Sequence, residues 1–514
     1  MDGRPLGVVG AGTMGAGIAQ VAAVGGFEVI LFDVAEGAST RAIKRIDDLL
    51  GRAVERGRMS EPDAAAAAAR ITAAGAIEDL AGCFLVIEAV AEKLEIKQDL
   101  FKRLAEFVEL NTVLATNTSS IPVTAIAGPV PGPERVVGMH FFNPVPLMKL
   151  VEVIAGLKTG EQSLAVAREA GRRMGRESID AADGPGFVVN RVSRPFLLES
   201  QQLLSEGVAD HATIDRAVRL GGGFRMGPFE LSDLVGIDVG YEVAKSFFEL
   251  GHGEPRWRPS SIPARMVAGG LLGRKSGHGY YVYAEDGSYR EQDPPPQQPE
   301  SAEGGVVILG DTPLAGQLRR LAGAAGFTLD PPAGEPALTI DARAFGAGSA
   351  PVGERIGPVI VLCAGNSLAT AARGRDMVGF HVLPPLAQTH TVELTRGSGT
   401  SDETYARARQ FFHSIGKHTI EVGDAPGLVL GRIACQLINE ACFALQEGVA
   451  DQDDIDTGVK LGLNYPRGLF EWLSAIGNTQ VFATIDALQR EIGGDRYRPA
   501  PNLRRAVLEN RPLQ

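Results

Sequence analysis

Gly10-Ala11-Gly12-Thr13-Met14-Gly15 is a GxGxxG motif with apolar sequence on both sides. Residues 6–9 before it form an apolar run of strand length, and residues 16–24 after it are small and apolar, as in a buried helix. Residues 28–32 read as a second strand, which Asp33 ends. A strand, a glycine turn, a helix and a second strand followed by an acidic residue predict the βαβ unit of a dinucleotide-binding domain.

Each glycine of the motif has its own physical role. Gly10 permits the tight turn, Gly12 lets the backbone approach a pyrophosphate, and Gly15 allows close packing of helix and strand. The unpaired N–H groups at the start of the helix then face the phosphate charge. We therefore assign the cofactor's phosphates to Gly10, Ala11, Gly12, Thr13, Met14 and Gly15.

Asp33 decides which dinucleotide is expected. Its carboxylate would accept hydrogen bonds from the adenosine ribose hydroxyls and would repel a 2′-phosphate. No Arg or Lys follows it before Arg41. We expect NAD rather than NADP.

Length and composition exclude several classes of protein. A chain of 514 residues has room for three or four domains, and its net charge of −12 gives no attraction to nucleic acid or to an anionic membrane. The four cysteines form no CxxC pair and the eight histidines show no metal-ligand spacing, so we expect reduced, buried thiols, a cytoplasmic location and no metal. The uncharged stretch 5–27 carries seven glycines where the turn needs them, which favours the βαβ unit over a membrane span.

The next segments alternate between strand and helix signals. Residues 35–80 are rich in Ala, Arg and Glu and indicate a helical excursion, with a helix start at Ser60. Strand signals follow at residues 84–87, 112–115, 136–141 and 149–154, which predicts a doubly wound, mainly parallel sheet. Helical periodicity replaces them at residues 188–204, 214–220 and 229–247, and a Pro-rich linker follows at 291–300.

Behind the linker the sequence repeats itself at a constant offset of 241 residues. Val137-Gly138-Met139-His140 returns as Val378-Gly379-Phe380-His381, and Asp183-Gly184-Pro185-Gly186 returns as Asp424-Ala425-Pro426-Gly427. The start of the second copy, residues 307–310, aligns with the first strand only at an offset of 300, so about 59 residues of its nucleotide domain are missing. A single offset kept over a long stretch indicates a duplication.

The second copy lacks the phosphate turn, because Gly12 corresponds to Thr312 and Gly15 to Ala315. We expect it to bind no dinucleotide. The predicted domains are residues 1–182, a dinucleotide-binding domain; 183–283, a helical domain; 284–303, a linker; 304–423, a reduced and degenerate copy of the first domain; and 424–514, a second helical domain.

His140 and Glu152 form the candidate catalytic pair. His140 ends one expected strand and Glu152 lies in the next, so the two side chains meet if these strands are neighbours. An imidazole beside a carboxylate suits alcohol oxidation, because the imidazole takes the hydroxyl proton while the carboxylate fixes the tautomer and stabilises the imidazolium. The spacing alone is equally compatible with a structural histidine.

Four longer motifs resemble the L-3-hydroxyacyl-CoA dehydrogenase family. The similarity extends over residues 6–283 almost without a break, and the layout of two copies resembles the bacterial enzymes of phenylacetate catabolism that act on 3-hydroxyadipyl-CoA. The motifs are Thr116-Asn117-Thr118-Ser119-Ser120, His140-Phe141-Phe142-Asn143-Pro144-Val145-Pro146-Leu147-Met148-Lys149-Leu150-Val151-Glu152, Asp183-Gly184-Pro185-Gly186-Phe187-Val188-Val189-Asn190-Arg191 and Gly227-Pro228-Phe229-Glu230.

The resemblance implies a fold and an activity. The fold would be a Rossmann-type doubly wound sheet with an all-helical C-terminal domain like that of 6-phosphogluconate dehydrogenase, followed by a truncated copy of both. The activity would be NAD-dependent oxidation of an L-3-hydroxyacyl-CoA to the 3-oxoacyl-CoA, in phenylacetate or fatty-acid catabolism, with 3-hydroxyadipyl-CoA or 3-hydroxybutyryl-CoA as substrate. Two alternatives stay open: a β-hydroxyacid dehydrogenase acting on a free acid, and an NAD-binding scaffold without chemistry.

Site roles follow from the same resemblance. His140 would be the general base and Glu152 its orienting partner, while Ser119 and Asn190 would hydrogen-bond the substrate oxygen and the histidine. Residues that would line the cofactor are Glu92, Lys97, Asn143 and Lys275.

Three of these residues also allow a simpler, structural interpretation. Lys97 is also compatible with a solvated helix charge, Lys275 with a surface base and Asn190 with a helix start. Residues 55–70 match the family's CoA-binding stretch poorly, so no individual CoA contact is assigned. The positive charges of Arg45, Arg52, Arg56 and Arg58 are interpreted as a solvated helix face.

In the second copy, His381 and Glu393 keep the spacing of His140 and Glu152, but Gly431 replaces Asn190. We interpret this pair as a relic that still ties two strands together. The two helical domains are expected to pack as an internal pseudo-dimer through the apolar stretch 428–445, because single-copy relatives dimerise through this domain. A further homodimer is left open.

Overall fold

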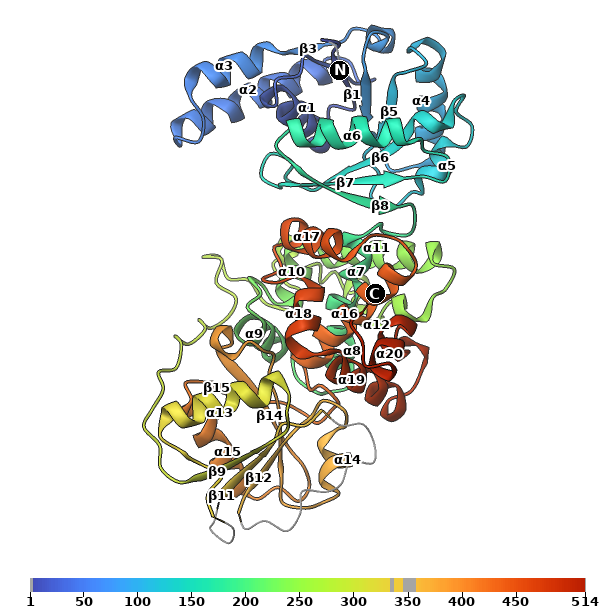
Figure 1. Ribbon diagram of the computed structural model, residues 1–514. Coiled ribbons are helices and arrows are strands. Elements are labelled where there is room, and N and C mark those ends of the chain that lie inside the picture. The colour runs from blue at the N-terminus through green and yellow to red at the C-terminus, as the bar shows by residue number, and fades with distance from the viewer. Residues whose placement is uncertain (1–2, 333–336, 345–356, 514) are drawn as a thin grey trace. The chain divides into compact units, whose positions relative to one another are not determined.

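The computed structural model describes residues 3–332, 337–344 and 357–513, and its contacts divide the chain into two compact units. The first unit comprises residues 1–191 together with 448–463, and the second comprises residues 192–447 and 464–514 (Figure 1). One helix of the second copy is therefore part of the first unit. The five-domain division stays a prediction.

The first unit is built on an eight-stranded sheet of order β3-β2-β1-β4-β5-β6-β7-β8. Neighbouring strands are parallel except β6 and β7, which are antiparallel with His140 opposite Glu152. The doubly wound sheet expected from sequence is thus confirmed. The strands are β1 (Leu6–Val9), β2 (Val29–Phe32), β3 (Ile71–Ala73), β4 (Leu85–Glu88), β5 (Val113–Thr116), β6 (Val136–Phe141), β7 (Leu150–Ala155) and β8 (Glu177–Ala182).

Helices join these strands. Ser60 caps α3 by accepting a hydrogen bond from the Asp63 N–H, which confirms the helix start expected there. The helices of this unit are α1 (Thr13–Val24), α2 (Ala38–Glu55), α3 (Glu61–Ala69), α4 (Leu94–Phe107), α5 (Val123–Ala127), α6 (Glu161–Arg173), α7 (Val189–Val192) and, from the second copy, α17 (Gln452–Leu463), with short 3-10 turns at Ile77–Leu80 and Pro133–Arg135.

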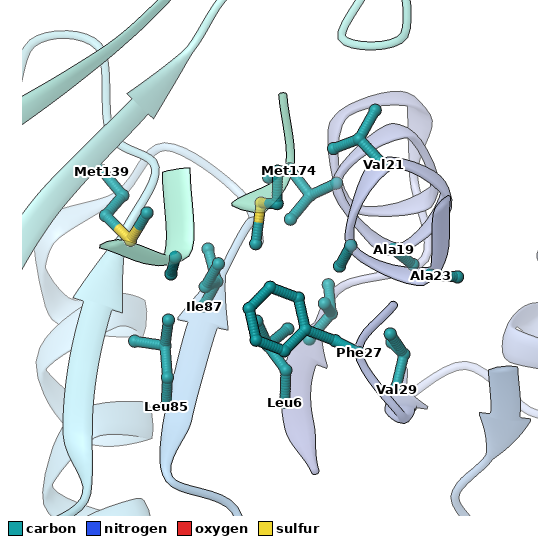
Figure 2. Close-up of a cluster of buried hydrophobic side chains, with 14 of the residues drawn as sticks. Leu6, Ala19, Val21, Ala23, Phe27, Val29, Leu85, Ile87, Met139 and Met174 are labelled. Atoms are coloured by element: carbon teal, nitrogen blue, oxygen red, sulfur yellow. The ribbon is translucent and has the colours of Figure 1, made fainter. Parts of the chain in front are cut away.

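The core of this unit lies between the sheet and its helices. All four residues of β1 and of β4 are buried, as is usual for central strands of a parallel sheet. Phe27 inserts between α1 and the strands, beside Leu6 and Met174 (Figure 2). Buried apolar surface of this kind is the main term that stabilises the sheet.

Two edge strands gave no recognisable signal in the sequence. β3 has three residues and lies within the stretch interpreted as purely helical, and β8 carries Glu177 and Asp180 toward solvent. Edge strands bury one side only and carry polar residues, so apolar runs do not reveal them.

The second unit contains a seven-stranded sheet of order β10-β9-β11-β12-β13-β14-β15, again with one antiparallel pair, β13 with β14. In the first copy α2, α3 and β3 lie between β2 and β4, whereas here only residues 330–336 join β10 to β11. The absence of counterparts to α2, α3 and β3 accounts for most of the residues that the second nucleotide domain lacks. The strands are β9 (Gly305–Leu309), β10 (Thr328–Leu329), β11 (Ala337–Asp341), β12 (Val359–Leu362), β13 (Val378–His381), β14 (Thr391–Arg396) and β15 (His418–Glu421).

Helices make up the rest of the second unit, and the apolar α16 is almost completely buried where it packs on α8. Gly236, with a φ of 101°, separates α10 from α11. The helices are α8 (Arg194–Ser205), α9 (His211–Gly222), α10 (Pro228–Val235), α11 (Ile237–Leu250), α12 (Ser261–Ala268), α13 (Pro313–Ala325), α14 (Leu368–Ala372), α15 (Asp402–Ser414), α16 (Leu430–Gln446), α18 (Leu469–Ile476), α19 (Asn478–Glu491) and α20 (Pro501–Leu508), with 3-10 turns at Pro255–Trp257, Arg274–Ser276, Leu386–Gln388 and Asp495–Tyr497.

The Pro-rich linker has no helix or strand and is mostly exposed, as expected, but it is anchored to the second unit. Asp293 accepts two hydrogen bonds of 2.8 Å from Arg219, and the Pro295 carbonyl lies 2.7 Å from His418 Nε2. A bidentate guanidinium–carboxylate pair fixes direction as well as distance. The linker therefore follows a defined path.

The four cysteines are free and buried, which confirms this part of the sequence analysis. Within the described ranges, no helix is long and apolar enough to cross a membrane.

Candidate active site

The glycine turn has the geometry that a pyrophosphate needs. Gly10 has a φ of 104°, and a Cβ atom there would lie 2.5 Å from the Ala89 carbonyl oxygen. A Cβ atom at Gly15 would lie 1.8 Å from the Gly10 carbonyl oxygen, whereas one at Gly12 would meet nothing within 4 Å. Gly12 is also the N-cap of α1, without a side-chain cap or an acidic first turn. The open space and the free helix N-terminus fit a dinucleotide phosphate.

Asp33 lies beside this turn and helps to shape it. One carboxylate oxygen accepts a 2.7 Å hydrogen bond from the Ala11 N–H and the other a 2.9 Å bond from the Ala35 N–H. Arg45 donates to the Ala11 carbonyl oxygen over 3.0 Å. Since a carboxylate offers about four acceptor positions, Asp33 keeps some for the ribose hydroxyls.

Lys97 is buried, so the alternative of a solvated helix charge is wrong. Its side chain is 1% exposed, and Nζ lies 2.7 Å from Glu88 Oε1 and 3.1 Å from Glu92 Oε2. Although Lys97 is on α4, the helix turns it toward the carboxyl ends of the strands. A buried ammonium needs such anionic partners to offset its lost hydration.

Sequence reasoning missed Glu88, which is fully buried at the end of β4. Its carboxylate accepts hydrogen bonds of 2.7 Å from Val90 N–H, Lys97 Nζ and Thr116 Oγ1. The available signal was an acidic residue directly after three apolar strand residues, at the edge where the ligands of such sheets bind.

Glu92 connects this cluster to Ser119. Its Oε1 accepts hydrogen bonds from Thr118 Oγ1 at 2.6 Å and from the Ser119 N–H at 2.9 Å. Burial by itself would raise the pKa of Glu92, but the charge of Lys97 and these hydrogen bonds outweigh burial and lower it. Glu92 is thus held as a carboxylate beside the Ser119 turn.

The His–Glu pair forms across β6 and β7. His140 Nδ1 lies 2.6 Å from Glu152 Oε2, and the Glu152 side chain is fully buried. The other carboxylate oxygen, Oε1, accepts hydrogen bonds from the N–H groups of Val188 at 3.0 Å and Val189 at 2.9 Å. Glu152 therefore holds the imidazole on one side and is itself held by the start of α7 on the other.

Aromatic rings enclose the imidazole of His140. The ring centroids of Phe142 and Phe187 lie 4.6 and 5.9 Å from that of the imidazole. The Asn117 side chain fixes the strand by accepting a 2.8 Å hydrogen bond from the Phe141 N–H. Asn143 is exposed in the loop after β6.

Asn190 lies in the first turn of α7, directly after Val189, where the alternative interpretation placed it, at the start of a helix. Lys275 belongs to the second unit, where its ammonium pairs with Asp238 at 2.5 Å. The loop that carries it is anchored by Asp233, which accepts 2.9 Å hydrogen bonds from the Tyr280 and Tyr281 N–H groups. The other predicted site residues all belong to the first unit, whereas Lys275 belongs to the second.

Comparison with known families decides what this site belongs to. The NAD-binding domain of 3-hydroxyacyl-CoA dehydrogenase matches residues 5–184 and again 365–425. The C-terminal domain of 3-hydroxyacyl-CoA dehydrogenase matches residues 186–283 and 427–513. The chain belongs to the 3-hydroxyacyl-CoA dehydrogenase family. It is an NAD-dependent oxidoreductase, as the sequence analysis expected.

Individual relatives agree with this family. The 3-hydroxyadipyl-CoA dehydrogenase of Escherichia coli K12 is 38% identical, and the similarity covers 99% of this chain and 98% of that protein. A probable 3-hydroxybutyryl-CoA dehydrogenase of Deinococcus radiodurans is 42% identical over 54% of this chain and 99% of its own length. The crystal structure of a 3-hydroxybutyryl-CoA dehydrogenase from Escherichia coli K12 superposes with a TM-score of 0.84 at 35% identity and covers 99% of both chains.

The second copy of this dehydrogenase does not contain a working pair. Glu393 accepts hydrogen bonds from the Val429 and Leu430 N–H groups, as Glu152 does from Val188 and Val189, but His381 Nδ1 has no hydrogen-bond partner in the described part of the chain. A Cβ atom at Gly431 would lie 2.1 Å from His381 Cε1. The imidazole thus occupies the space that any side chain at position 431 would need.

The interpretation that His381 and Glu393 still tie their strands together is therefore wrong. β13 and β14 pair through their backbones with these two residues in register, but the side chains are not joined. Burial lowers the pKa of His381 to about 4 and raises the pKa of Glu393 to about 8, so both are uncharged at neutral pH. Glu393 instead fastens β14 to the start of α16.

The phosphate turn is also closed in the second copy. Thr312 caps α13 by accepting a 3.1 Å hydrogen bond from the Ala315 N–H, and its hydroxyl donates to the Ala342 carbonyl oxygen. Pro313 at the first helical position has no N–H to offer. This geometry agrees with the expectation that the second copy binds no dinucleotide.

Proposed function

We propose that the enzyme oxidises the 3-hydroxyl group of an L-3-hydroxyacyl-CoA to a ketone at one active site, in the N-terminal half. The observation that carries this proposal is the 2.6 Å contact between His140 Nδ1 and the buried carboxylate of Glu152. Because Nδ1 donates to Glu152, Nε2 is left as the proton acceptor. NAD, when bound, supplies the hydride acceptor.

The other predicted site residues receive supporting roles. Ser119, whose N–H is held by Glu92, and Asn190, which directly follows the second backbone donor to Glu152, Val189, would bind the substrate oxygen and the imidazole. We assign Glu92, Lys97, Asn143 and Lys275 to the cofactor. Their contacts with each other in the first unit support this for Glu92 and Lys97.

For the acyl group we propose 3-hydroxyadipyl-CoA or 3-hydroxybutyryl-CoA, in phenylacetate or fatty-acid catabolism. The support is the activity of the two relatives described above, a 3-hydroxyadipyl-CoA dehydrogenase and a probable 3-hydroxybutyryl-CoA dehydrogenase. Rates with acetoacetyl-CoA, 3-oxoadipyl-CoA and longer 3-oxoacyl-CoA esters, measured by NADH oxidation, would rank these substrates. Equal kcat/KM for all of them would contradict a preference for short chains.

A β-hydroxyacid dehydrogenase acting on free acids is the alternative enzyme. We expect kcat/KM for free 3-hydroxybutyrate to be at least about a hundredfold below that for its CoA thioester, because binding energy from the remote CoA moiety contributes to catalysis. Parallel assays of NADH formation with both compounds test this. Comparable values would favour the free-acid enzyme.

Asp33 leads to a prediction about the cosubstrate. We expect NADPH to react at least about tenfold more slowly than NADH in the reduction of acetoacetyl-CoA, because its 2′-phosphate would meet the Asp33 carboxylate. The wild-type enzyme is the right material, since Asp33 also holds the N–H groups of Ala11 and Ala35 and its replacement would disturb the turn. Similar rates with both cosubstrates would contradict a role of Asp33 in excluding NADPH.

We further propose that the two helical domains form an internal pseudo-dimer in a cytoplasmic enzyme. Direct contact between the two helical domains supports it: α16 packs on α8, and Arg432 of α16 reaches Glu206 at 2.6 Å. Sedimentation at the mass of a single chain would agree with this arrangement, and a dimer would show the further association left open above.

A further inference from the structure

The helix α17 belongs to the second copy in sequence and to the first unit in space. It packs on β7 and β8, and two of its glycines face the sheet. A Cβ atom at Gly458 would lie 3.0 Å from Ile179 Cδ1 and 3.0 Å from Val189 Cγ2, and one at Gly462 would lie 2.9 Å from Leu150 Cδ2 and 3.3 Å from Val189 Cγ1. The four-residue spacing puts both glycines on one face of the helix.

Hydrogen bonds from backbone N–H groups of β8 fasten the same helix to the sheet. The Ala182 N–H donates to the Val449 carbonyl oxygen, just before α17, over 2.8 Å. The Asp180 N–H donates to Asp454 Oδ2 over 3.1 Å. α17 is thus fixed at its start by hydrogen bonds and along its length by close packing.

Val189 connects this helix to the catalytic pair. Its side chain lies against Gly458 and Gly462, and its N–H donates to Glu152 Oε1 over 2.9 Å. Glu152 in turn holds His140. A shift of α17 therefore moves Val189, the carboxylate and the imidazole in succession, because packed interiors transmit displacement.

The equivalent contact, related by the 241-residue offset, exists in the second unit. Gly221 of α9, which corresponds to Gly462, faces Leu430, and a Cβ atom there would lie 2.7 Å from Leu430 Cδ2. The Leu430 N–H donates to Glu393 over 2.9 Å. The two copies thus support each other's glutamate in the same way, but only Glu152 serves a hydrogen-bonded histidine.

We propose that α17 is a positioning element of the N-terminal active site, so that the degenerate copy contributes to catalysis through Gly458 and Gly462 without binding cofactor or substrate itself. The inference rests on the proposed role of the His140–Glu152 pair. The second copy has lost its phosphate turn and its His–Glu contact, but this function in positioning needs neither of them.

The test compares G462V with the matched control G221V. Both put the same β-branched side chain at equivalent positions of equivalent helices, so their effects on helix propensity are alike. We expect G462V to lower kcat about tenfold, because small displacements of catalytic groups are costly. The dissociation constant of NADH, from its fluorescence, should change less than twofold. G221V should keep kcat within about twofold of the wild type.

G462A and G221A form a milder pair in case a valine variant does not fold. The alanine methyl at position 462 must displace Val189 or Leu150 by only a few tenths of an ångström, so we expect a drop in kcat of about threefold against no change in G221A. Equal losses of kcat in the two members of a pair, or none in either, would overturn the proposal. Either result would leave the role of His140 intact, which its own substitution tests.

Discussion

H140Q is expected to lower kcat by about a thousandfold while NADH still binds with wild-type affinity. General-base catalysis contributes about 10²–10⁴-fold, and a glutamine amide cannot accept the hydroxyl proton. The substitution should not disturb the cofactor site, because the glycine turn and the Glu88–Lys97–Glu92 cluster do not contact His140 through any hydrogen bond in the described structure. Steady-state oxidation of 3-hydroxybutyryl-CoA and a fluorescence titration with NADH measure the two quantities.

H381Q is the matched control for this experiment. The second histidine has the same place on its strand but lacks the contact with its glutamate and is buried under Gly431. Its replacement should leave kcat within about twofold of the wild type, since it moves no proton. Near-normal activity of H140Q, or an equal loss in H381Q, would contradict a single active site served by His140.

R432M is expected to lower the free energy of unfolding by about 3–5 kcal/mol, the usual cost of removing one partner of a buried ion pair. Arg432 is fully buried in α16, pairs with Glu199, which is 2% exposed, and reaches Glu206 at 2.6 Å and Tyr497 Oη at 2.6 Å. Without the guanidinium, the buried carboxylate of Glu199 loses the cation that pairs with it. Urea unfolding followed by circular dichroism measures the change.

Two further variants separate this buried charge from ordinary surface pairing. E199Q combined with R432M should recover part of the loss, because the fully buried pair is then removed as a whole and the remaining carboxylate, Glu206, is 25% exposed to water. R172M, which breaks the exposed pair of Arg172 with Glu169, should cost no more than about 1 kcal/mol. If R432M were no more destabilising than R172M, the α8–α16 contact would not depend on this network.

Local patterns predicted much of the candidate site. The turn around Gly10, Gly12 and Gly15 can be recognised from the sequence, because its backbone conformation and close contacts require residues without a side chain. His140 and Glu152 could be paired in advance because two strands joined by a short loop are usually neighbours. The register that makes them directly opposite is now observed.

Other features of the site could not be read from the chain. The burial of Lys97 depends on Glu88, nine residues earlier, and on the neighbouring strand that supplies Thr116. The side-chain contact expected for His381 is missing because Gly431, fifty residues later, leaves room for the imidazole to turn away. The spacing of residues in the sequence does not show which rotamer a side chain adopts or how much space surrounds that side chain.

The sequence by itself determined the duplicated fold, the dinucleotide turn and the identity of the His–Glu pair, because each depends on residues close together in the chain or on a repeat at constant offset. Only the tertiary structure decided that α17 lies against Val189, that Glu88 anchors Lys97 and that the second pair is disconnected. These contacts join residues from different strands and helices, and which of them meet is settled by how whole elements pack together.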